Sequence, residues 1–114
     1  MIPYNKMISY SQEVNGHRAD VTLINNYINN PNVNGVFLEI GGFDGITYSN
    51  TYALEKYFNF TGILIEPSPL SFKKMIKNRP KCLNINCAIS NHLTCPIFKM
   101  SQKIYIYSIY NEYI

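Results

Sequence analysis

The sequence has few of the features that would make a small chain a disulfide scaffold, a membrane span or a disordered tail. Its three cysteines are an odd number, which argues against a disulfide framework and favours a reducing compartment such as the cytoplasm. No apolar run approaches the ~18 residues needed to cross a bilayer, and residues 1–10 lack the apolar block of a signal peptide. Charged residues make up only 15% against 46% hydrophobic residues, so we expect a packed core.

Cysteine and histidine are also poorly placed for a metal site. The soft side chains near the end of the chain lack the tight CxxC spacing that zinc sites usually use. We therefore expect no metal and interpret the cysteines as buried thiols. The side chains in question are Cys82, Cys87, His92 and Cys95.

Basic residues slightly outnumber acidic ones, giving a net charge of +3, and they form one dense cluster. Such a cluster can contact phosphates or a membrane surface. Its spacing, however, favours the solvated face of a helix and the segment after it, so a nucleic-acid partner is not expected. The cluster consists of Lys73, Lys74, Lys77, Arg79 and Lys81.

Hydrophobic periodicity divides the middle of the chain into alternating helices and strands. Helices are predicted for residues 20–28, 52–58 and 69–77. Capping residues are Asp20, Ser68 and the Ser49 to Thr51 segment. Strands are predicted for residues 36–40, 63–66 and 82–89. This alternation predicts an α/β fold with a parallel sheet of three or more strands and flanking helices. Because the strands are apolar throughout, we expect both sheet faces to be covered.

The two ends of the chain are less regular than its middle. We expect an irregular lead-in at residues 1–19, a ligand-binding region at residues 20–91 and a divergent tail at residues 92–114. Within the tail, residues 104–110 have strong β-propensity but no polar face. They fit equally well a last strand or residues that have lost their natural continuation.

The turn after the first predicted strand, residues 41–45, lies where open parallel sheets bind ligands. A dinucleotide fingerprint would need a second glycine where Phe43 stands, and a phosphate-binding loop would need a G-K-[ST] sequence that is absent. Residues 35–55 contain no Lys, Arg or His but include three acids. The turn therefore disfavours phosphate and favours a ligand that carries an amino group.

S-adenosylmethionine suits this chemistry because it carries an ammonium, a sulfonium and a carboxylate but no phosphate. Glu39 or Asp44 could attract its positive groups, and amides at Ser49, Asn50 and Thr51 could hold its carboxylate. Glu66 follows Gly45 by 21 residues, a position from which an acid accepts hydrogen bonds from ribose hydroxyls. Two plainer interpretations stay open: the glycines form only a turn, and Glu39 is a buried acid paired with an amide.

Five segments in this order resemble the FkbM methyltransferase family, and the resemblance covers about residues 11–91. It includes the lead-in around Ser11, Gln12 and Asp20. The segments are V-F-L-E-I-G-G-F-D-G (36–45), S-N-T (49–51), G-I-L-I-E-P (62–67), N-R-P (78–80) and N-C-A-I-S (86–90).

The resemblance implies a partial Rossmann-like class I methyltransferase fold with S-adenosylmethionine as cofactor. It implies methyl transfer to an oxygen or nitrogen of a small molecule or sugar. The residues matched to the cofactor site are Glu39, Gly41, Gly42, Asp44, Gly45, Ser49, Asn50, Thr51, Glu66, Pro67, Cys87 and Ala88.

The sequence departs from the family after Asn91. Family members continue with a strand carrying an Asp and then an acidic-Gly pair, whereas the one acid beyond Glu66 is Glu112. A candidate general base is therefore missing, and an incomplete sheet would leave an open edge for a homo-oligomer or another pairing. Three hypotheses follow: a methyltransferase, a cofactor-binding or regulatory module without activity, and a remnant without a stable fold. A dehydrogenase is disfavoured by Phe43.

Overall fold

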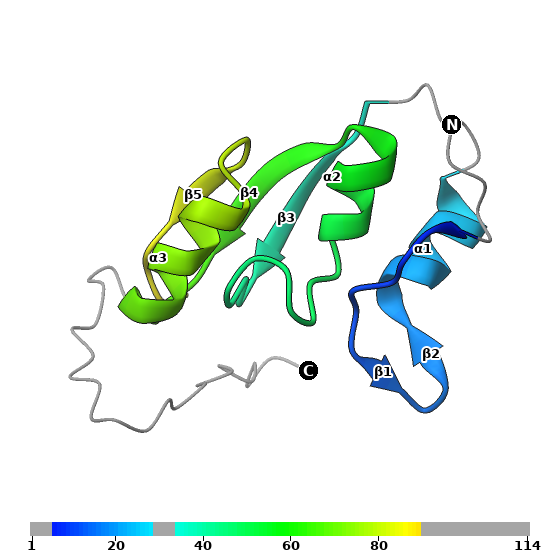
Figure 1. Cartoon of the computed structure of the whole chain (residues 1–114), viewed down its shortest axis with the longest axis horizontal. Helices are drawn as coiled ribbons and strands as arrows, with labels where there is room; N and C mark the ends of the chain where they lie inside the picture. Colours follow the sequence, from blue (N-terminus) through cyan, green and yellow to red (C-terminus); the bar gives the residue numbers. More distant parts are fainter. Residues whose placement is uncertain (1–5, 29–33, 90–114) are drawn as a thin grey trace.

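A computed structural model of the chain describes residues 6–28 and 34–89 (Figure 1). The elements follow one another as a short hairpin, a helix and then alternating strands and helices. In chain order they are β1 (Glu13–Val14), β2 (His17–Arg18), α1 (Ala19–Tyr27), β3 (Val36–Ile40), α2 (Tyr52–Phe58), β4 (Thr61–Ile65), α3 (Pro69–Asn78) and β5 (Leu83–Ile85).

Strands β3, β4 and β5 form a parallel sheet in that order, and the expected α/β arrangement is confirmed. Leu38 pairs with Ile63, which in turn pairs with Leu83. Each parallel step requires a crossover, and α2 and α3 supply the two crossovers. The carboxyl ends of the three strands consequently meet at one edge of the sheet, which carries the glycine turn.

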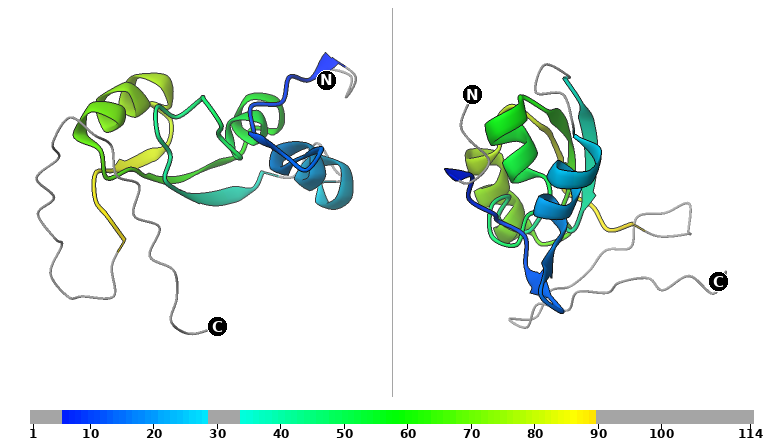
Figure 2. Two further views of the ribbon diagram at one scale, coloured as in Figure 1. Left: turned by 90° about the horizontal axis from the view of Figure 1, so that it is seen from below. Right: turned by 90° about the vertical axis from the view of Figure 1, so that its right-hand side faces the viewer.

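The helices α2 and α3 lie on the same face of the sheet (Figure 2). Leu64, Met75 and Cys82 form the core between that face and α3. A second core joins α1 to α2 through Ile24 and Leu54. The expectation that both faces would be covered is wrong for the described residues, because the alternate aliphatic side chains of β3 and β5 are exposed. The apolar strand pattern was sufficient to predict the strands but not the layer opposite α2 and α3.

Segment boundaries differ from the predictions in several places. Strand β4 begins at Thr61, two residues before its predicted start, and ends at Ile65, one residue before its predicted end. Residues 13–18, expected to be irregular, form the antiparallel hairpin β1–β2. Its turn is Asn15-Gly16, with φ of 51° and 76°, the positive values that a two-residue hairpin turn requires. Helix α1 begins at Ala19, so Asp20 lies within its first turn and is not its N-cap. Strand β5 ends at Ile85, four residues before the predicted end.

Helix α3 begins as predicted. Ser68 is its N-cap and accepts a hydrogen bond from the Ser71 amide at 3.4 Å, and Pro69 occupies the first turn. Among the described residues, no helix is long and apolar enough to cross a membrane. The tail at 92–114, with His92 and Cys95, and the predicted stop of the first helix at 29–31 lie outside the described residues.

Candidate functional site at the carboxyl edge of the sheet

The glycine turn is anchored to the neighbouring strand. The amides of Gly41 and Gly42 both donate to the carbonyl oxygen of Ile65, at 2.8 and 2.9 Å, and the Gly45 amide closes the turn onto Gly42 at 2.8 Å. Gly41 and Gly45 adopt φ of 78° and 89°, where an L side chain would be strained. The turn therefore bends from the end of β3 over the end of β4.

Glu66 holds this turn from the end of β4. Its Oε2 accepts a hydrogen bond from the Phe43 amide at 2.7 Å, and its Oε1 accepts one from the Ser68 amide at 2.8 Å. The side chain is only 7% exposed. An ionised carboxylate has about four acceptor positions, so two hydrogen bonds leave about two positions open. Glu66 thus joins the glycine turn to the start of α3 and retains capacity for a ligand.

Glu39 and Glu66 lie on the same face of the sheet. Glu39 pairs with Leu64, and Glu66 follows Leu64 by two residues, so both carboxylates point toward the side that α2 and α3 cover. The two acids therefore lie on one side of the sheet at its carboxyl edge.

Glu39 is engaged by the segment before α2. Its Oε2 accepts from the Ser49 and Thr51 hydroxyls, and its Oε1 accepts from the Asn50 amide at 2.7 Å. The amides of Thr51 and Tyr52 donate in turn to the Ser49 Oγ, at 3.2 and 3.0 Å. These carboxylate and amide groups therefore bind one another, and they fix the segment into which the glycine turn leads.

Asp44 closes a local turn within the same loop. Its Oδ1 accepts from the Ile46 and Thr47 amides at 2.9 and 2.7 Å, and its Oδ2 accepts from the Thr47 hydroxyl at 2.7 Å. The Asp44 carbonyl oxygen accepts from the Asn78 side chain at 2.8 Å, which ties the loop to α3. Asp44 is half-buried, whereas Glu39 and Glu66 are buried, so solvent reaches the Asp44 carboxylate more readily than the other two.

The segment after β5 lies beside Glu66. The Asn86 side chain donates to the carbonyl oxygens of Glu66 and Pro67, at 2.8 and 3.2 Å. Cys87 and Ala88, which the resemblance matches to the cofactor site, follow directly and are half-buried. Glu66 and these two residues therefore follow neighbouring strands, β4 and β5.

Arg79 is the central residue of the site, although its sequence position suggested a surface cluster. Its side chain is 0% exposed. It forms an ion pair with Glu55, and Nη1 donates to the Gly45 carbonyl oxygen at 2.8 Å and to the Ser49 Oγ at 3.3 Å. Its Nη2 donates to the Thr51 hydroxyl at 3.2 Å. One guanidinium therefore connects α3, the glycine turn and the start of α2.

Two aromatic rings flank the Arg79 guanidinium. Its central carbon lies 5.3 Å from the ring centroid of Phe37 and 5.2 Å from that of Tyr52, within cation–π range. Cys82 donates to the Glu55 carboxylate at 3.2 Å. Burial, together with that hydrogen bond, raises the pKa of the Cys82 thiol, which is therefore a buried protonated group and not a nucleophile.

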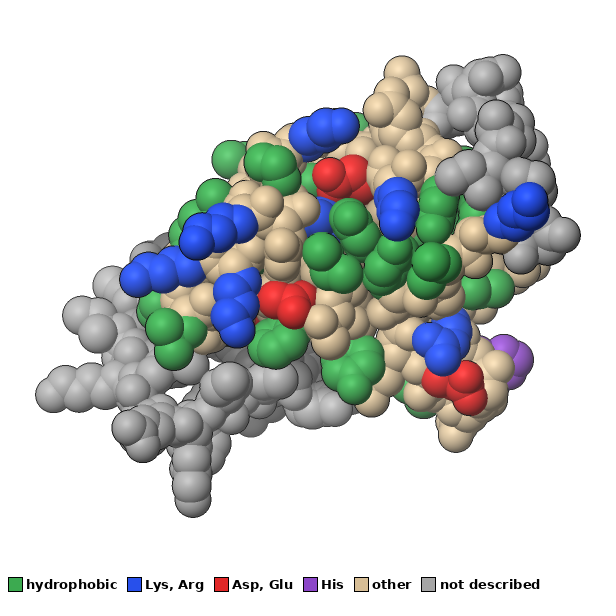
Figure 3. Space-filling view, in the orientation of Figure 1, with side chains coloured by type: hydrophobic (Ala, Val, Ile, Leu, Met, Phe, Trp, Pro, Cys, Tyr) green, Lys and Arg blue, Asp and Glu red, His purple; other side chains and the backbone are tan. Residues whose placement is uncertain are grey.

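The other members of the basic cluster are solvent-exposed, in agreement with the sequence interpretation. Lys and Arg side chains gather over α3 (Figure 3). The exposed members are Lys73, Lys74, Lys77 and Lys81.

The lead-in is fastened to the site through Asp20 and Ser11, which are 0% and 1% exposed. The Asp20 carboxylate accepts from the Ser9 hydroxyl at 2.6 Å and from the Tyr10 and Ser11 amides at 2.7 and 3.2 Å. The Ser11 hydroxyl contacts the Asn50 Oδ1 at 2.8 Å. Asp20 therefore fixes a loop that buttresses the segment before α2.

Two aromatic residues of the loop adopt left-handed backbone conformations. Phe43 has φ of 52° and Tyr48 has φ of 57°, values that are uncommon for bulky residues and cost about 1–3 kcal/mol each. Both rings are exposed, at 40% and 63%. The surrounding hydrogen bonds maintain this strained backbone. The two rings are thereby exposed at the carboxyl edge of the sheet.

Low pH should destabilise the loops that the Asp20 and Asp44 carboxylates hold in place. Burial alone would raise the pKa of Asp20, but hydrogen bonds from Ser9 and from backbone amides outweigh it and hold that pKa below its ordinary value. For Asp44, burial is likewise outweighed by hydrogen bonds from Thr47 and Ile46, and its pKa is also lowered. A carboxyl whose folded pKa is depressed stabilises the fold above its unfolded pKa of about 3.9 and loses that contribution as pH falls through the folded pKa.

We therefore expect the free energy of unfolding, measured with urea, to fall as the pH drops from about 5 to below 4. Asp20→Asn should be less stable than the parent at neutral pH, and the difference should shrink in acid. A difference between the two proteins that is constant with pH would contradict the assignment.

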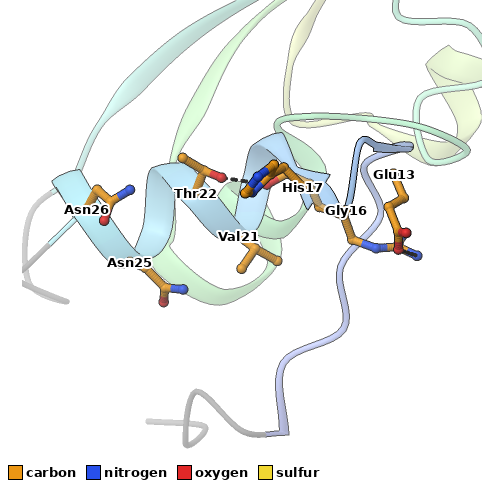
Figure 4. A pocket seen from close by; sticks show the side chains of 8 residues that line it. Glu13, Gly16, His17, Val21, Thr22, Asn25 and Asn26 are labelled. Atoms are coloured by element: carbon orange, nitrogen blue, oxygen red, sulfur yellow. Dashed lines mark hydrogen bonds and ion pairs between the residues drawn. The ribbon is translucent and has the colours of Figure 1, made fainter.

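Two hollows among the described residues lie away from the turn. The first, of about 280 Å³, is lined by the β1–β2 hairpin and α1 (Figure 4). The second, of about 360 Å³, lies around the amino ends of β3 and β4 and includes Glu55 and Lys81. Neither is lined by Glu66 or the glycine turn. Within the described part of the chain, no three His, Cys, Asp or Glu side chains are grouped to hold a metal.

Several residues of the site were missed by sequence reasoning. Phe43 carried a recognisable signal, since a bulky residue inside a glycine turn implies strain. Ser11 carried none as a binding partner, because its contacts reach across 38 and 39 residues. Arg79 was matched only as part of a motif and counted with the surface lysines.

Comparisons with protein-family models, with curated proteins and with solved structures gave no match to this chain.

Proposed function

We propose that this chain binds S-adenosylmethionine at the carboxyl edge of its sheet, as the cofactor-binding part of an FkbM-type methyltransferase. The observation that carries the proposal is Glu66. It lies beneath the glycine turn, faces the same side as Glu39, and has acceptor positions left after binding the Phe43 and Ser68 amides.

The charge of the site supports a cationic ligand. Arg79 forms ion pairs with Glu55 and Glu39, and Lys74 interacts with Asp44. With Glu66, these four carboxylates and two cations leave a formal charge of −2. Opposite charge attracts the sulfonium and ammonium groups and repels phosphates.

The residues divide into those that would touch the cofactor and those that position them. Glu66 would accept the ribose hydroxyls, and the half-buried Asp44 would face the positive groups. Glu39 and Arg79 are already paired with the loop, so their role is to hold Ser49 and Thr51 in place. When bound, S-adenosylmethionine supplies an electrophilic methyl group, and transfer then depends on proximity and in-line orientation of an acceptor.

A second candidate is a cofactor-binding module without turnover. It is favoured by the sequence after Glu66, in which the one acid is Glu112, so that a candidate general base is missing. The acceptor of the first candidate would be a small molecule or a sugar.

Calorimetric titration tests the proposal directly. We expect S-adenosylmethionine and its demethylated product to bind with Kd on the order of micromolar, about −8 kcal/mol. ATP shares the adenosine but carries a triphosphate, so we expect it to bind at least ~10-fold more weakly beside carboxylates. No heat with S-adenosylmethionine on a sample that melts cooperatively would refute the proposal.

Turnover separates the two candidates. The protein would be incubated with labelled S-adenosylmethionine and a panel of sugars and small hydroxyl or amino compounds, and the demethylated product would be quantified. Product above the level of a no-protein control supports the enzyme. Binding without product on any acceptor supports the module.

A further inference from the structure

The outer side of α3 combines an exposed leucine with exposed lysines. These residues follow one another at positions i, i+3, i+4 and i+7, which places them within an arc of about 100° on one side of the helix. Leu70 is 74% exposed, whereas Ser71 and Met75, on the other side of the helix, are buried. The outer side consists of Leu70, Lys73, Lys74 and Lys77 and is called the lysine face below.

The lysine face has no acid that balances its charge. Residues 67–89 contain no Asp or Glu. Within the described ranges none of its three lysines forms an ion pair, although Asp44 interacts electrostatically with Lys74. Lys81, three residues after the end of α3, adds a further exposed positive charge. The positive charge over α3 (Figure 3) is therefore available to an anionic partner.

We propose that the lysine face docks on the surface of an anionic lipid bilayer. This inference does not depend on the proposed cofactor. The lysine ammonium groups would lie level with the headgroup phosphates, and the Leu70 side chain would enter the boundary between headgroups and acyl chains. Each lysine near an anionic bilayer strengthens binding about 5-fold. The charge of this face is thus complementary to such a surface, and its exposed leucine gains an apolar environment there.

The residue types of the face favour a bilayer over a nucleic acid. Proteins that bind nucleic acids use arginine to contact bases and aromatic rings on which bases stack. The lysine face offers neither group. Arg79 is 0% exposed, and Phe72, the aromatic residue of α3, is half-buried against the core that contains Leu64 and Met75. An exposed leucine adds nothing to a phosphate contact, whereas it strengthens attachment to a bilayer.

Co-sedimentation with lipid vesicles tests the proposal in the full chain. Vesicles of phosphatidylcholine alone would be compared with vesicles of two parts phosphatidylcholine to one part phosphatidylserine. We expect the protein to pellet with the vesicles that contain phosphatidylserine and to be released as salt is added, because mobile ions screen exposed charges. Failure to pellet with these vesicles at low salt, or equal binding to both kinds of vesicle, would overturn the proposal.

Charge reversal locates the contact on α3. Lys73→Glu should weaken binding to the phosphatidylserine vesicles about 25-fold, since it replaces an attractive charge with a repulsive one. Lys6→Glu is the matched control, because it makes the same change at an exposed lysine beside Met7, which packs on the core between α1 and α2. We expect the control to bind like the parent. Equal losses in the two variants would attribute binding to net charge and refute a role for this face.

Leu70→Ser separates a bilayer from a nucleic acid as the partner. It leaves the charge unchanged, so it should weaken binding to the vesicles several-fold and leave any binding of labelled DNA oligonucleotides at the same salt concentration unaltered. Because the substituted side chains are exposed, all three variants should melt at the temperature of the parent. Unchanged vesicle binding by Leu70→Ser, or tighter binding per phosphate to the oligonucleotides than to the vesicles, would contradict the proposal.

Discussion

Arg79→Met is expected to destabilise the protein by about 3–5 kcal/mol, a large part of the 5–15 kcal/mol by which small domains are stable. The guanidinium is fully buried and neutralises Glu55. Removing it leaves the Glu55 carboxylate without its cation and leaves the Gly45 carbonyl and the Thr51 hydroxyl without a donor. We expect urea unfolding followed by circular dichroism to show the loss.

Lys77→Met is the matched control, since Lys77 is an exposed residue near the end of the same helix. Its effect should stay within about 0.5 kcal/mol. Combining Arg79→Met with Glu55→Gln should restore part of the lost stability, because the uncompensated charge is then removed. If Arg79→Met matched the control, the buried ion pair would not be what holds the loop to the two helices.

The strands that carry the site could be predicted because their signals are local. The apolar run at residues 36–40 is bounded by glycines, and β3 has these limits. Ser68 followed by Pro69 marks a helix start by capping and by a fixed φ, and α3 begins there. Glu66 could be placed at the carboxyl edge for the same reason, since it follows an apolar run directly.

Roles that depend on tertiary contacts could not be predicted. Asp20 has the residue type of a helix cap, yet its carboxylate binds the backbone of residues 10 and 11. The sequence left Glu39 either as a ligand contact or as a buried acid paired with an amide, and it accepts three hydrogen bonds from the segment before α2, one of them from the Asn50 amide. A sequence pattern indicates that an acid is buried near a loop. Whether its partner is a ligand or the loop itself depends on the distances between the carboxylate and the donor groups in the folded chain.

The face of the sheet opposite α2 and α3 shows a second limit of prediction from sequence. An apolar strand with no polar alternation predicts burial on both sides, and this holds only if some segment covers the second side. The side of β3 that carries Phe37 and Glu39 is covered by helices that follow in the chain. No local signal in the sequence says what would cover the side that carries Leu38.

Glu66→Gln is expected to abolish the discrimination between ribose and 2′-deoxyribose ligands. A glutamine keeps the shape of the side chain but has one acceptor oxygen for the two amides of Phe43 and Ser68. A hydrogen bond to a charged group contributes about 1.5–3 kcal/mol, so losing one to the ribose should weaken S-adenosylmethionine binding by about 10- to 150-fold.

Loss of affinity alone would not separate a ligand contact from damage to the glycine turn. Adenosine and 2′-deoxyadenosine would therefore be titrated into the parent, into Glu66→Gln and into Glu13→Gln, a control at an exposed acid of β1. The parent and the control should prefer adenosine, and Glu66→Gln should bind the two nucleosides almost equally. If Glu66→Gln weakened both nucleosides by one common factor, Glu66 would act on the turn alone, and the adenosine moiety would have to be bound by another group.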